Sequence, residues 1–379
     1  MKEIMDSTVT RRSLLKIPAA AAAFGAPAIL GAQSPNDTIR VAYIGVGNRG
    51  GYSLRNMLKV AGAKVVAVCD LLPDRTDLAA STVAKESGAS PKTYTDYRKL
   101  LDELKDVDAF VVSTPDWTHR EIDIAVLATG KHLYAEKPLS LTIEDCKAVR
   151  NAAHASKSIM QVGFQLRHDP RRKAAEDFIH GGGIGKVLMC HGIRHGGDLP
   201  RRIPWYFDKT KCGDIMVDQG VHILDLFLWA IGSHPLRAMG SGGTNLFIDE
   251  PPGRTVMDNY NIIFEYPGDV RVNFSHHYFD PPKFSGDQER VFGSLGSIDL
   301  VEAAWQGREK KGPPIKLDVP EADLDSTYTA LRAFIGYVRD NKQPINNVDS
   351  AFESTAQVIM GTKAIYEKRI VTWEEVVGA

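Results

Sequence analysis

The sequence has few cysteines and almost no net charge. It contains four cysteines in 379 residues, none in a CxxC pair, and its 46 lysines and arginines nearly balance its 47 aspartates and glutamates. The scarcity of cysteine excludes a disulfide framework or a cysteine-rich zinc module as the basis of the fold. Because no excess of positive charge is available to attract phosphate backbones, we expect no nucleic-acid partner.

Long hydrophobic runs are also scarce. The main apolar run, residues 17–32, is too short and too rich in alanine to predict a membrane span. It follows paired arginines in the segment TRRSLLK (residues 10–16), and small residues suited to cleavage close it at Ala28 or Ala32. These features predict that residues 1–32 are a twin-arginine signal peptide recognised by the Tat translocase, so we expect a periplasmic or otherwise exported protein. The alternative is a basic flank before a membrane anchor.

The remaining residues are enough for two domains, and the composition, 43% apolar and 25% charged, is that of an ordinary globular protein. From residue 38 onward, short apolar runs alternate with helical patterns. Strands are predicted at residues 39–44, 64–69, 107–113, 132–135 and 159–162, and helices at 52–60, 73–87, 119–129 and from 142 onward. This alternation predicts an α/β Rossmann domain with a parallel, doubly wound sheet over residues 38–163.

The pattern changes after residue 163. One helix between Asp169 and Gly181 is followed by longer alternating segments, and two helices close the chain. The alternating segments are residues 186–195, 256–266 and 270–278, and the closing helices lie between 326 and 366. Runs of strands after a helix predict an α+β domain over residues 164–379 with a large, mostly antiparallel open sheet. Because one face of such a sheet needs covering, we expect a homo-oligomer, either a dimer or a tetramer.

A glycine-rich loop lies between the first predicted strand and the first predicted helix. It has the pattern GxGxxG and consists of Gly45, Val46, Gly47, Asn48, Arg49 and Gly50. In this context the pattern is typical of dinucleotide binding, although a glycine-rich turn without a ligand is the alternative. Gly45 permits a tight turn, Gly47 lets the backbone approach a pyrophosphate, and Gly50 allows the helix to pack closely on the strand. The free N–H groups at the helix N-terminus then face the phosphates.

An acidic residue, Asp70, ends the second predicted strand twenty residues after the loop. A carboxylate there accepts hydrogen bonds from the ribose hydroxyls and repels a 2′-phosphate, which favours NAD over NADP. Arg75 is close enough to weaken this preference, so NADP remains an alternative cofactor. Since no free nicotinamide pool is expected in the periplasm, an exported enzyme has to load its cofactor before export. We therefore expect a tightly bound cofactor that is reset within each catalytic cycle.

Three further clusters follow predicted strands or open a predicted helix. They are Thr114, Pro115, Asp116, Trp117, Thr118 and His119; Glu136, Lys137 and Pro138; and residues 218–222 (DQGVH). Together with the glycine loop and Gly163-Phe164-x-x-Arg167, they resemble the glucose–fructose oxidoreductase/inositol dehydrogenase (Gfo/Idh/MocA) family over almost the whole chain from residue 38. The resemblance implies a Rossmann domain followed by an α+β domain, with sugars, polyols or related carbohydrates as substrates. The family often has Asn where this chain has Asp116.

The resemblance also implies roles for individual residues. Lys137 would contact the substrate and the nicotinamide, His222 would be the general acid/base, and Asp218 would orient the substrate or His222. Besides the glycine loop and Asp70, the implied cofactor contacts are Thr114, Pro115, Asp116, His119, Glu136, Lys137 and Gln165, and Arg167 and His222 are implied substrate contacts. The resemblance further implies a cis peptide bond between Lys137 and Pro138.

Elementary chemistry is consistent with these roles. Removal of a hydride from a carbinol carbon needs a base for the hydroxyl proton, which suits His222, and a lysine ammonium can hydrogen-bond the developing alkoxide. Asp218 and His222 are four residues apart, which places both on one face of an α-helix. The alternatives are structural: His222 as a buried or capping histidine, Lys137 as a surface lysine, and Asp218 as a carboxylate that the helix N-terminus favours.

Other side chains are additional candidates for contacts with substrate in the expected cleft. His195 is a candidate substrate contact, and Trp205 and Tyr206 suit stacking on a sugar ring, with a buried loop anchor as the alternative. The histidines at positions 191, 195, 276 and 277 raise the question of a metal. Because no carboxylate has a spacing that completes a site, we expect none.

The leading functional hypothesis is an NAD(P)-dependent oxidoreductase that transfers a hydride between the bound cofactor and a carbohydrate carbinol carbon. One alternative is a glycosidase that oxidises the sugar transiently, eliminates the leaving group, adds water and reduces the sugar again. A third hypothesis is a non-catalytic sugar or nucleotide sensor on the same fold.

Overall fold

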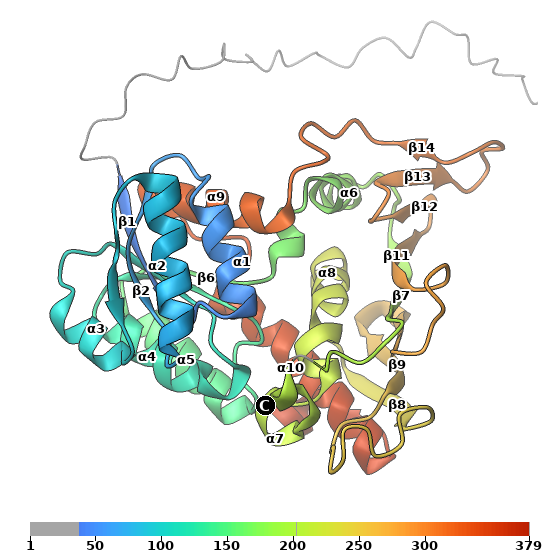
Figure 1. The fold of residues 1–379 in the computed structure, drawn as a ribbon. Helices are drawn as coiled ribbons and strands as arrows, with labels where there is room; N and C mark the ends of the chain where they lie inside the picture. The colour runs from blue at the N-terminus through green and yellow to red at the C-terminus, as the bar shows by residue number, and fades with distance from the viewer. Residues whose placement is uncertain (1–37, 202, 379) are drawn as a thin grey trace, which may run out of the picture. The chain divides into compact units, whose positions relative to one another are not determined.

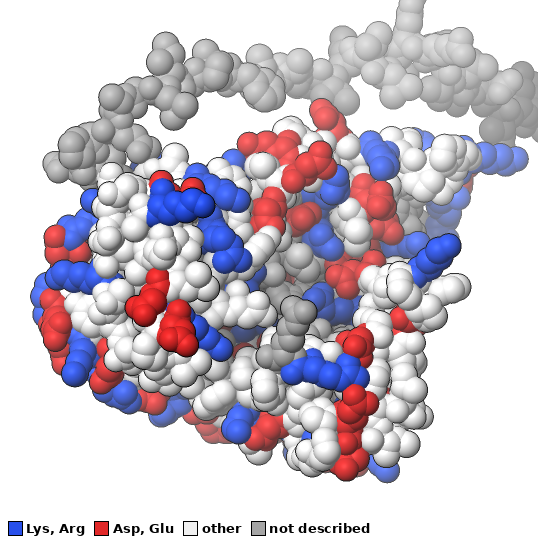
Figure 2. Space-filling model, viewed as in Figure 1, with Lys and Arg blue, Asp and Glu red and all other residues white. Residues whose placement is uncertain are grey.

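The computed structural model describes residues 38–201 and 203–378 (Figure 1). The predicted signal peptide, residues 1–32, lies outside the described residues, so its assignment stays a prediction. Among the residues that are described, no helix is both long and apolar enough to cross a lipid bilayer. Basic and acidic side chains are interspersed over the face shown in Figure 2, in keeping with the formal net charge of -1.

The N-terminal part is a six-stranded sheet of parallel strands in the order β3-β2-β1-β4-β5-β6. The strands are β1 (Ile39–Ile44), β2 (Ala63–Cys69), β3 (Lys92–Tyr94), β4 (Ala109–Val112), β5 (His132–Ala135) and β6 (Met160–Val162). The helices are α1 (Asn48–Met57), α2 (Pro73–Ser87), α3 (Tyr97–Glu103), α4 (His119–Ala128) and α5 (Ile143–Ala155). Alternate residues of β1 belong to different buried cores, Val41 and Tyr43 to one and Ala42 and Ile44 to the other. Both faces are therefore covered, and the predicted doubly wound Rossmann fold is confirmed.

Helix boundaries follow local capping chemistry. The Thr142 hydroxyl accepts a hydrogen bond from the Asp145 N–H (3.1 Å), which begins α5 where the sequence predicts it. Helix α1 begins at Asn48, four residues earlier than its predicted start at residue 52, because the chain enters the helix directly from the glycine loop. The predicted strand start at residue 256 is also wrong, since the strand begins at Asn259.

The C-terminal part contains a nine-stranded sheet in the order β14-β13-β12-β11-β7-β10-β9-β8-β15. The strands are β7 (Val187–His195), β8 (Arg237–Gly243), β9 (Asn259–Tyr266), β10 (Val270–His277), β11 (Gly286–Gly293), β12 (Gly296–Asp299), β13 (Ala304–Gly307), β14 (Ile315–Lys316) and β15 (Val371–Thr372). Only the pair β7–β10 is parallel within this described sheet. The predicted mostly antiparallel sheet is therefore confirmed.

Helices cover one face of this sheet. They are α6 (Pro170–His180), α8 (Val221–Ile231) and α10 (Val348–Glu367), and this part also contains the short helices α7 (Lys209–Cys212) and α11 (Trp373–Val377). Along β10 every second residue is buried, which is the pattern of a sheet with one packed face and one more accessible face. The oligomer predicted from the open face stays a prediction.

Helix α9 (Ser326–Asp340) returns to the Rossmann sheet after the second sheet is complete. Leu331 and Phe334 belong to the same core as Val41 and Tyr43 of β1, and Figure 1 shows α9 beside α1. The sequence pattern predicts a helix here but not its partner, because a helix pattern does not specify the surface on which the apolar face packs.

Candidate functional site

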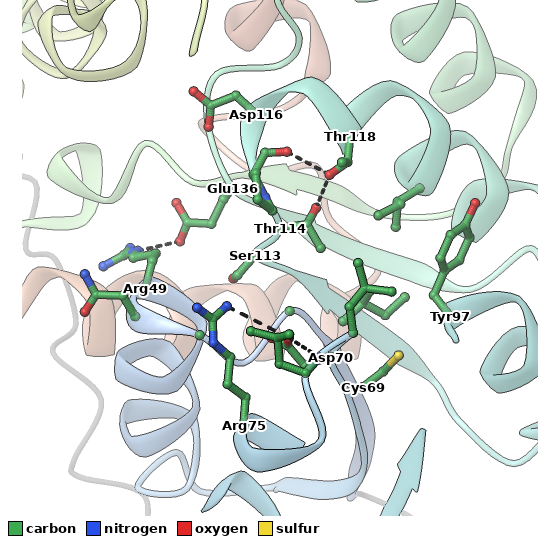
Figure 3. Close-up of a pocket in the computed structure, with 18 of the residues that line it drawn as sticks. Arg49, Cys69, Asp70, Arg75, Tyr97, Ser113, Thr114, Asp116, Thr118 and Glu136 are labelled. Atoms are coloured by element: carbon green, nitrogen blue, oxygen red, sulfur yellow. Dashed lines mark hydrogen bonds and ion pairs between the residues drawn. The ribbon is translucent and has the colours of Figure 1, made fainter. Parts of the chain in front are cut away.

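A cavity of about 1130 Å³ lies along the carboxyl ends of the Rossmann strands and extends to the second part of the chain. Arg49 of the glycine loop and residues at the ends of β2, β4 and β5 contribute to its wall (Figure 3). Residues 203–206 and Asp218 of the second part also line it. Ligands bind at this edge in doubly wound sheets, and the volume is slightly above the usual range for small-molecule sites. Of the predicted site residues, those lining the cavity are Gly45, Gly47, Asn48, Arg49, Asp70, Thr114, Pro115, Asp116, Glu136, Lys137, Trp205 and Asp218.

The geometry of the glycine loop requires glycine at two positions. Gly45 has a φ of +85°, and a Cβ there would lie 2.5 Å from the Ser113 carbonyl oxygen. A Cβ on Gly50 would lie 2.0 Å from the Gly45 carbonyl oxygen, so this residue lets α1 approach the loop without lining the cavity. Gly47 faces Arg75, whose Nη1 would be 2.7 Å from a Cβ at that position. The loop therefore brings bare backbone and a cation to one wall of the cavity.

Replacing Gly50 with alanine is expected to lower the free energy of unfolding by about 1–3 kcal/mol, because the added methyl group overlaps the backbone of Gly45. Gly51→Ala is the matched control. Its Cβ would lie 3.3 Å from the nearest atom, the Val46 carbonyl oxygen, and alanine favours a helix. Chemical denaturation of both variants measures the difference. Equal stability of Gly50→Ala and Gly51→Ala would contradict the close packing described for α1.

Asp70 lies at the end of β2, where backbone N–H groups hold its carboxylate. One oxygen accepts a hydrogen bond from Val46 N–H (3.0 Å) and the other from Leu72 N–H (3.1 Å). Nη1 of Arg75 is 3.9 Å from the same carboxylate and is half exposed (Figure 3). The cavity wall thus presents a fixed negative charge with a positive charge beside it.

Lys137 and Asp218 form an ion pair across the cavity wall. Lys137 Nζ donates to Asp218 Oδ1 (2.6 Å) and to the Asp218 carbonyl oxygen (2.7 Å), and the side chains are only 12% and 3% exposed. The Lys137–Pro138 peptide bond is cis, as the resemblance implies. Lys137 follows β5 of the Rossmann sheet, whereas Asp218 belongs to the second part of the chain. The pair therefore joins the two halves of the site.

Asp116 adds a second carboxyl group beside this pair. It is 3% exposed and follows β4, the strand next to β5. Burial raises the pKa of Asp116 well above its usual range, and the negative charge of Asp218 raises it further against the opposing effect of Lys137. The group is thus held protonated more readily than an ordinary aspartate. A protonated carboxyl has the size and the donor of the amide that often stands here in the family the sequence resembles.

Asp218 lies in a wide π-helical turn, Met216–Gly220, that leads directly into α8. The single α-helix expected here from the four-residue spacing is therefore wrong. The turn follows Asp214, whose carboxylate accepts a hydrogen bond from Met216 N–H (3.0 Å) and whose φ is +121°. Turns of this kind occur frequently at functional sites.

His222 lies in the first turn of α8. It is 8% exposed and does not line the cavity, and its Nδ1 is buried with no hydrogen-bond partner among the described residues. Burial lowers the pKa of His222 well below its usual range, and the positive charge of Lys137 lowers it further. The imidazole is therefore neutral near pH 7, which is the form that accepts a proton.

Glu136 and His119 brace the loops at the ends of β4 and β5. Glu136 Oε1 accepts a hydrogen bond from Arg49 Nε (2.7 Å), which links the glycine loop to the Lys137 segment (Figure 3). His119 is 1% exposed, and its two ring nitrogens lie 2.7 Å and 3.0 Å from the carbonyl oxygens of Pro138 and Thr114. Because both of its ring nitrogens contact backbone carbonyl groups, His119 is a positioning residue.

Three other predicted residues lie away from the cavity lining. Gln165 has a buried Oε1 without a partner among the described residues. Arg167 is 3% exposed, and its guanidinium donates to Asp225 at 2.9 Å and 2.7 Å. The structure thus gives Arg167 an ion pair with Asp225, and its predicted contact with substrate stays a prediction. His195 is directed toward Asp280 and Ser275 at the end of β7, not toward this cavity.

The structure places the sequence candidate Tyr206 in the cavity lining and adds Leu71 and Leu72, which the sequence did not predict. Tyr206 lines the cavity beside Trp205, with ring centroids 4.4 Å apart, and burial followed by the charge of Asp218 raises its pKa. Leu71 and Leu72 line the other end and are 83% and 51% exposed. Two consecutive leucines directly after the acidic end of a Rossmann strand were the available signal.

These residues fit a nicotinamide dinucleotide. The glycine loop offers backbone where a Cβ would clash, and several buried polar atoms have no partner among the described residues. In the cavity lining they are Ser113 Oγ, Asp116 Oδ2 and Glu136 Oε2. Buried polar atoms are normally paired, so a cluster of unpaired ones indicates a polar ligand.

Comparison with known proteins agrees with this geometry. The sequence model of GFO/IDH/MocA, described as an oxidoreductase family with an NAD-binding Rossmann fold, matches residues 39–164, and its C-terminal domain model matches residues 173–299. Inositol 2-dehydrogenase 3 from Saccharopolyspora erythraea is 32% identical over 284 residues, which are 73% of this chain and 77% of that protein. The chain belongs to the GFO/IDH/MocA family.

Other members of the GFO/IDH/MocA family are similar over different lengths. Inositol 2-dehydrogenase from Salmonella typhimurium is 30% identical over 196 residues, so the match covers 51% of this chain and only 55% of that protein. Two solved structures share the fold. They are aldose-aldose oxidoreductase from Caulobacter crescentus complexed with glycerol (20% identity, 88% of this chain and 99% of that chain, TM-score 0.76) and scyllo-inositol dehydrogenase from Lactobacillus casei with bound NAD(H) and scyllo-inositol (17%, 89% and 99%, 0.74).

Proposed function

We propose that this protein is an NAD-dependent oxidoreductase that transfers a hydride between the dinucleotide and a carbinol carbon of a sugar or polyol. The observation that carries the proposal is the Lys137–Asp218 ion pair in the wall of the same cavity as the glycine loop. Inositols and aldoses are the first substrates to test, because the similar proteins are named for them.

Each residue of the site has a separate role in the proposed reaction. When bound, the nicotinamide supplies the hydride acceptor or donor. Lys137 donates a hydrogen bond to the substrate oxygen and stabilises its negative charge as the hydroxyl proton leaves. His222 accepts that proton at a ring nitrogen, since its lowered pKa keeps it neutral. Asp218 holds the Lys137 ammonium in place, and protonated Asp116 keeps the cluster from carrying a second negative charge.

Cofactor preference is expected to depend on Asp70. Asp70→Asn removes the negative charge that opposes a 2′-phosphate and leaves Arg75 beside the cavity. We expect the ratio of the NAD and NADP dissociation constants to shift at least roughly 10-fold toward NADP, because a hydrogen bond to a charged group contributes about 1.5–3 kcal/mol. Titration of both dinucleotides into the same preparations measures the ratio. An unchanged ratio would show that Asp70 does not set the preference.

We also propose, from the twin-arginine pattern alone, that the protein is exported with its cofactor bound. A tightly held cofactor has to be reset within each cycle, either by a second carbohydrate or by a redox-neutral glycosidase sequence. Mass spectrometry of nucleotide released from extensively dialysed native protein tests the first part of this idea. Protein that is active only after added NAD would contradict it.

The function itself is tested with a panel of sugars, polyols and glycosides, monitored by nicotinamide absorbance and by product analysis. An oxidised carbohydrate formed in step with nucleotide reduction supports the proposal. A released aglycone with unchanged NAD supports the redox-neutral glycosidase instead. A protein that binds dinucleotide and sugar but converts nothing is a sensor.

A further inference from the structure

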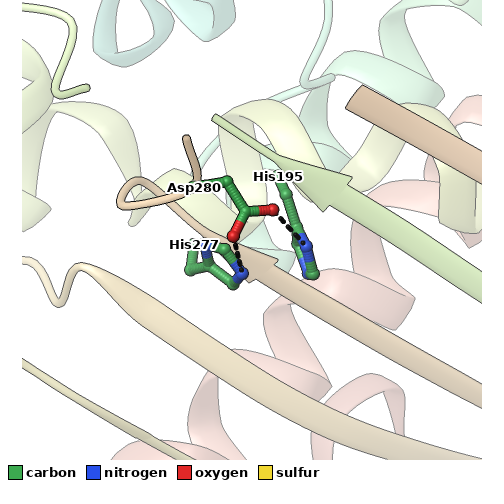
Figure 4. Close-up of side chains that lie close together, drawn as sticks. All are labelled: His195, His277 and Asp280. Carbon is green, nitrogen blue, oxygen red and sulfur yellow. Dashed lines mark hydrogen bonds and ion pairs between the residues drawn. The ribbon is translucent and has the colours of Figure 1, made fainter. Parts of the chain in front are cut away.

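Two histidines and an aspartate converge at the ends of β7 and β10, outside the dinucleotide cavity. His195 and His277 are direct partners in the parallel pairing of these strands, so their rings lie side by side on one face of the sheet with centroids 3.6 Å apart. Two backbone hydrogen bonds continue the pairing past the strands, from Gly196 N–H to His277 O (2.7 Å) and from Asp280 N–H to Gly196 O (3.1 Å). Asp280 is thereby brought back to the rings, with one carboxylate oxygen directed at each (Figure 4).

The donor atoms have the spacing of a metal site. His195 Nδ1 is 3.2 Å from Asp280 Oδ2, His277 Nε2 is 3.4 Å from Asp280 Oδ1, and one donor from each residue lies within 4.8 Å of the others. Donors bound at about 2.0–2.1 Å to a tetrahedral ion are roughly 3.3 Å apart. The three side chains are 15%, 15% and 19% exposed, which leaves an ion a route from solvent.

A neighbouring serine orients the ring of His195. Its Nε2 lies 2.9 Å from Ser275 Oγ, an outer contact of the kind that fixes ring orientation and leaves the other nitrogen to a metal.

We propose that His195, His277 and Asp280 bind one divalent transition-metal ion at a site separate from the dinucleotide cavity. Zinc is the ion that we expect there. Two imidazoles and a carboxylate are a donor set that zinc accepts, with remaining positions open to water or another ligand. The sequence-based expectation of no metal rested on the lack of a suitably spaced carboxylate. That premise is wrong, because Asp280, three residues after His277, supplies the carboxylate. An ion here would tie the ends of the only parallel strand pair in the described sheet to the segment that follows.

Zinc chloride titrated into chelator-treated full-length protein tests the proposal by calorimetry, with elemental analysis of the dialysed complex. We expect one zinc per chain, and we expect Asp280→Asn and His277→Gln each to weaken binding more than 10-fold. His191→Gln is the matched control, because His191 lies on the same strand and face, four residues from His195, but outside the cluster.

Thermal unfolding separates loss of the site from loss of the fold. Zinc should raise the Tm of the wild type and of His191→Gln but leave that of Asp280→Asn unchanged. Cobalt(II) should give the visible absorption of a four-coordinate site in the wild type. This absorption should be absent in Asp280→Asn. Wild-type protein that takes up no stoichiometric zinc, or zinc affinity that is equal in the wild type and Asp280→Asn, would overturn the proposal and leave a hydrogen-bonded His–Asp–His cluster.

Discussion

Lys137→Met is expected to lower kcat about 100- to 1,000-fold with a smaller change in dinucleotide affinity. Methionine keeps much of the side-chain length but removes the ammonium that we propose hydrogen-bonds the substrate oxygen, and loss of one such donor has an effect of this size. The variant should also be less stable, because Asp218 is 3% exposed and loses its ion-pair partner. Breaking a buried pair by removing one member costs about 3–5 kcal/mol. Steady-state kinetics and chemical denaturation measure the two effects.

The double variant Lys137→Met/Asp218→Asn separates catalysis from folding. Removing both charges leaves no unpaired carboxylate, so most of the lost stability should return while kcat stays low. If activity returns together with stability, Lys137 acts only through the fold. If Lys137→Met keeps wild-type kcat, the proposed role of the ammonium is wrong.

His222→Asn is expected to lower kcat about 100- to 10,000-fold, the range for loss of a general acid or base. Asparagine preserves polarity and approximate size but cannot exchange a proton near neutral pH. Dinucleotide binding should be nearly unchanged, since His222 does not line the cavity beside the glycine loop. His191→Asn is the control for histidine loss elsewhere. Wild-type turnover by His222→Asn would remove His222 from the reaction.

The pH dependence gives a second readout for His222. Because burial lowers its pKa below the usual 6.5, neutral imidazole persists as pH falls, and kcat/KM should decline only below about pH 6.5. The free energy of unfolding should also decrease as pH falls. The unfolded chain binds this proton more readily, so the stabilisation is complete above pH 6.5 and is lost as pH falls toward the lowered pKa. Burial also lowers the pKa of His276. The stability of the His222 variant should therefore still depend on pH through His276.

The parts of the site that depend on local sequence were predictable. The glycine loop and Asp70 lie where the pattern places them, since the spacing of strand, loop and helix fixes the position of each. Lys137 lies at the cavity because parallel strands end at a common edge, so strand ends distant in sequence meet there.

The parts that depend on long-range packing were not predictable. Arg167 pairs with Asp225, 58 residues away, and nothing near Arg167 in the sequence indicates this partner. Asp280 meets His195 only because β7 and β10 are parallel neighbours, which a strand pattern does not specify. The sequence around Asp218 is compatible with an α-helix, but the structure has a π-helical turn, which differs in its backbone hydrogen bonds.

The proposed reaction requires that the cavity hold a nicotinamide dinucleotide whose ring exchanges hydride with a carbinol carbon between Lys137 and His222. Transfer of an isotopic label tests it most directly. Cofactor-loaded protein is mixed with a polyol or sugar deuterated at its carbinol carbons, and the released nucleotide is weighed by mass spectrometry. We predict one deuterium on the nicotinamide of the wild type and almost none with Lys137→Met. Conversion of the substrate with an unlabelled nucleotide at every time point would contradict the account.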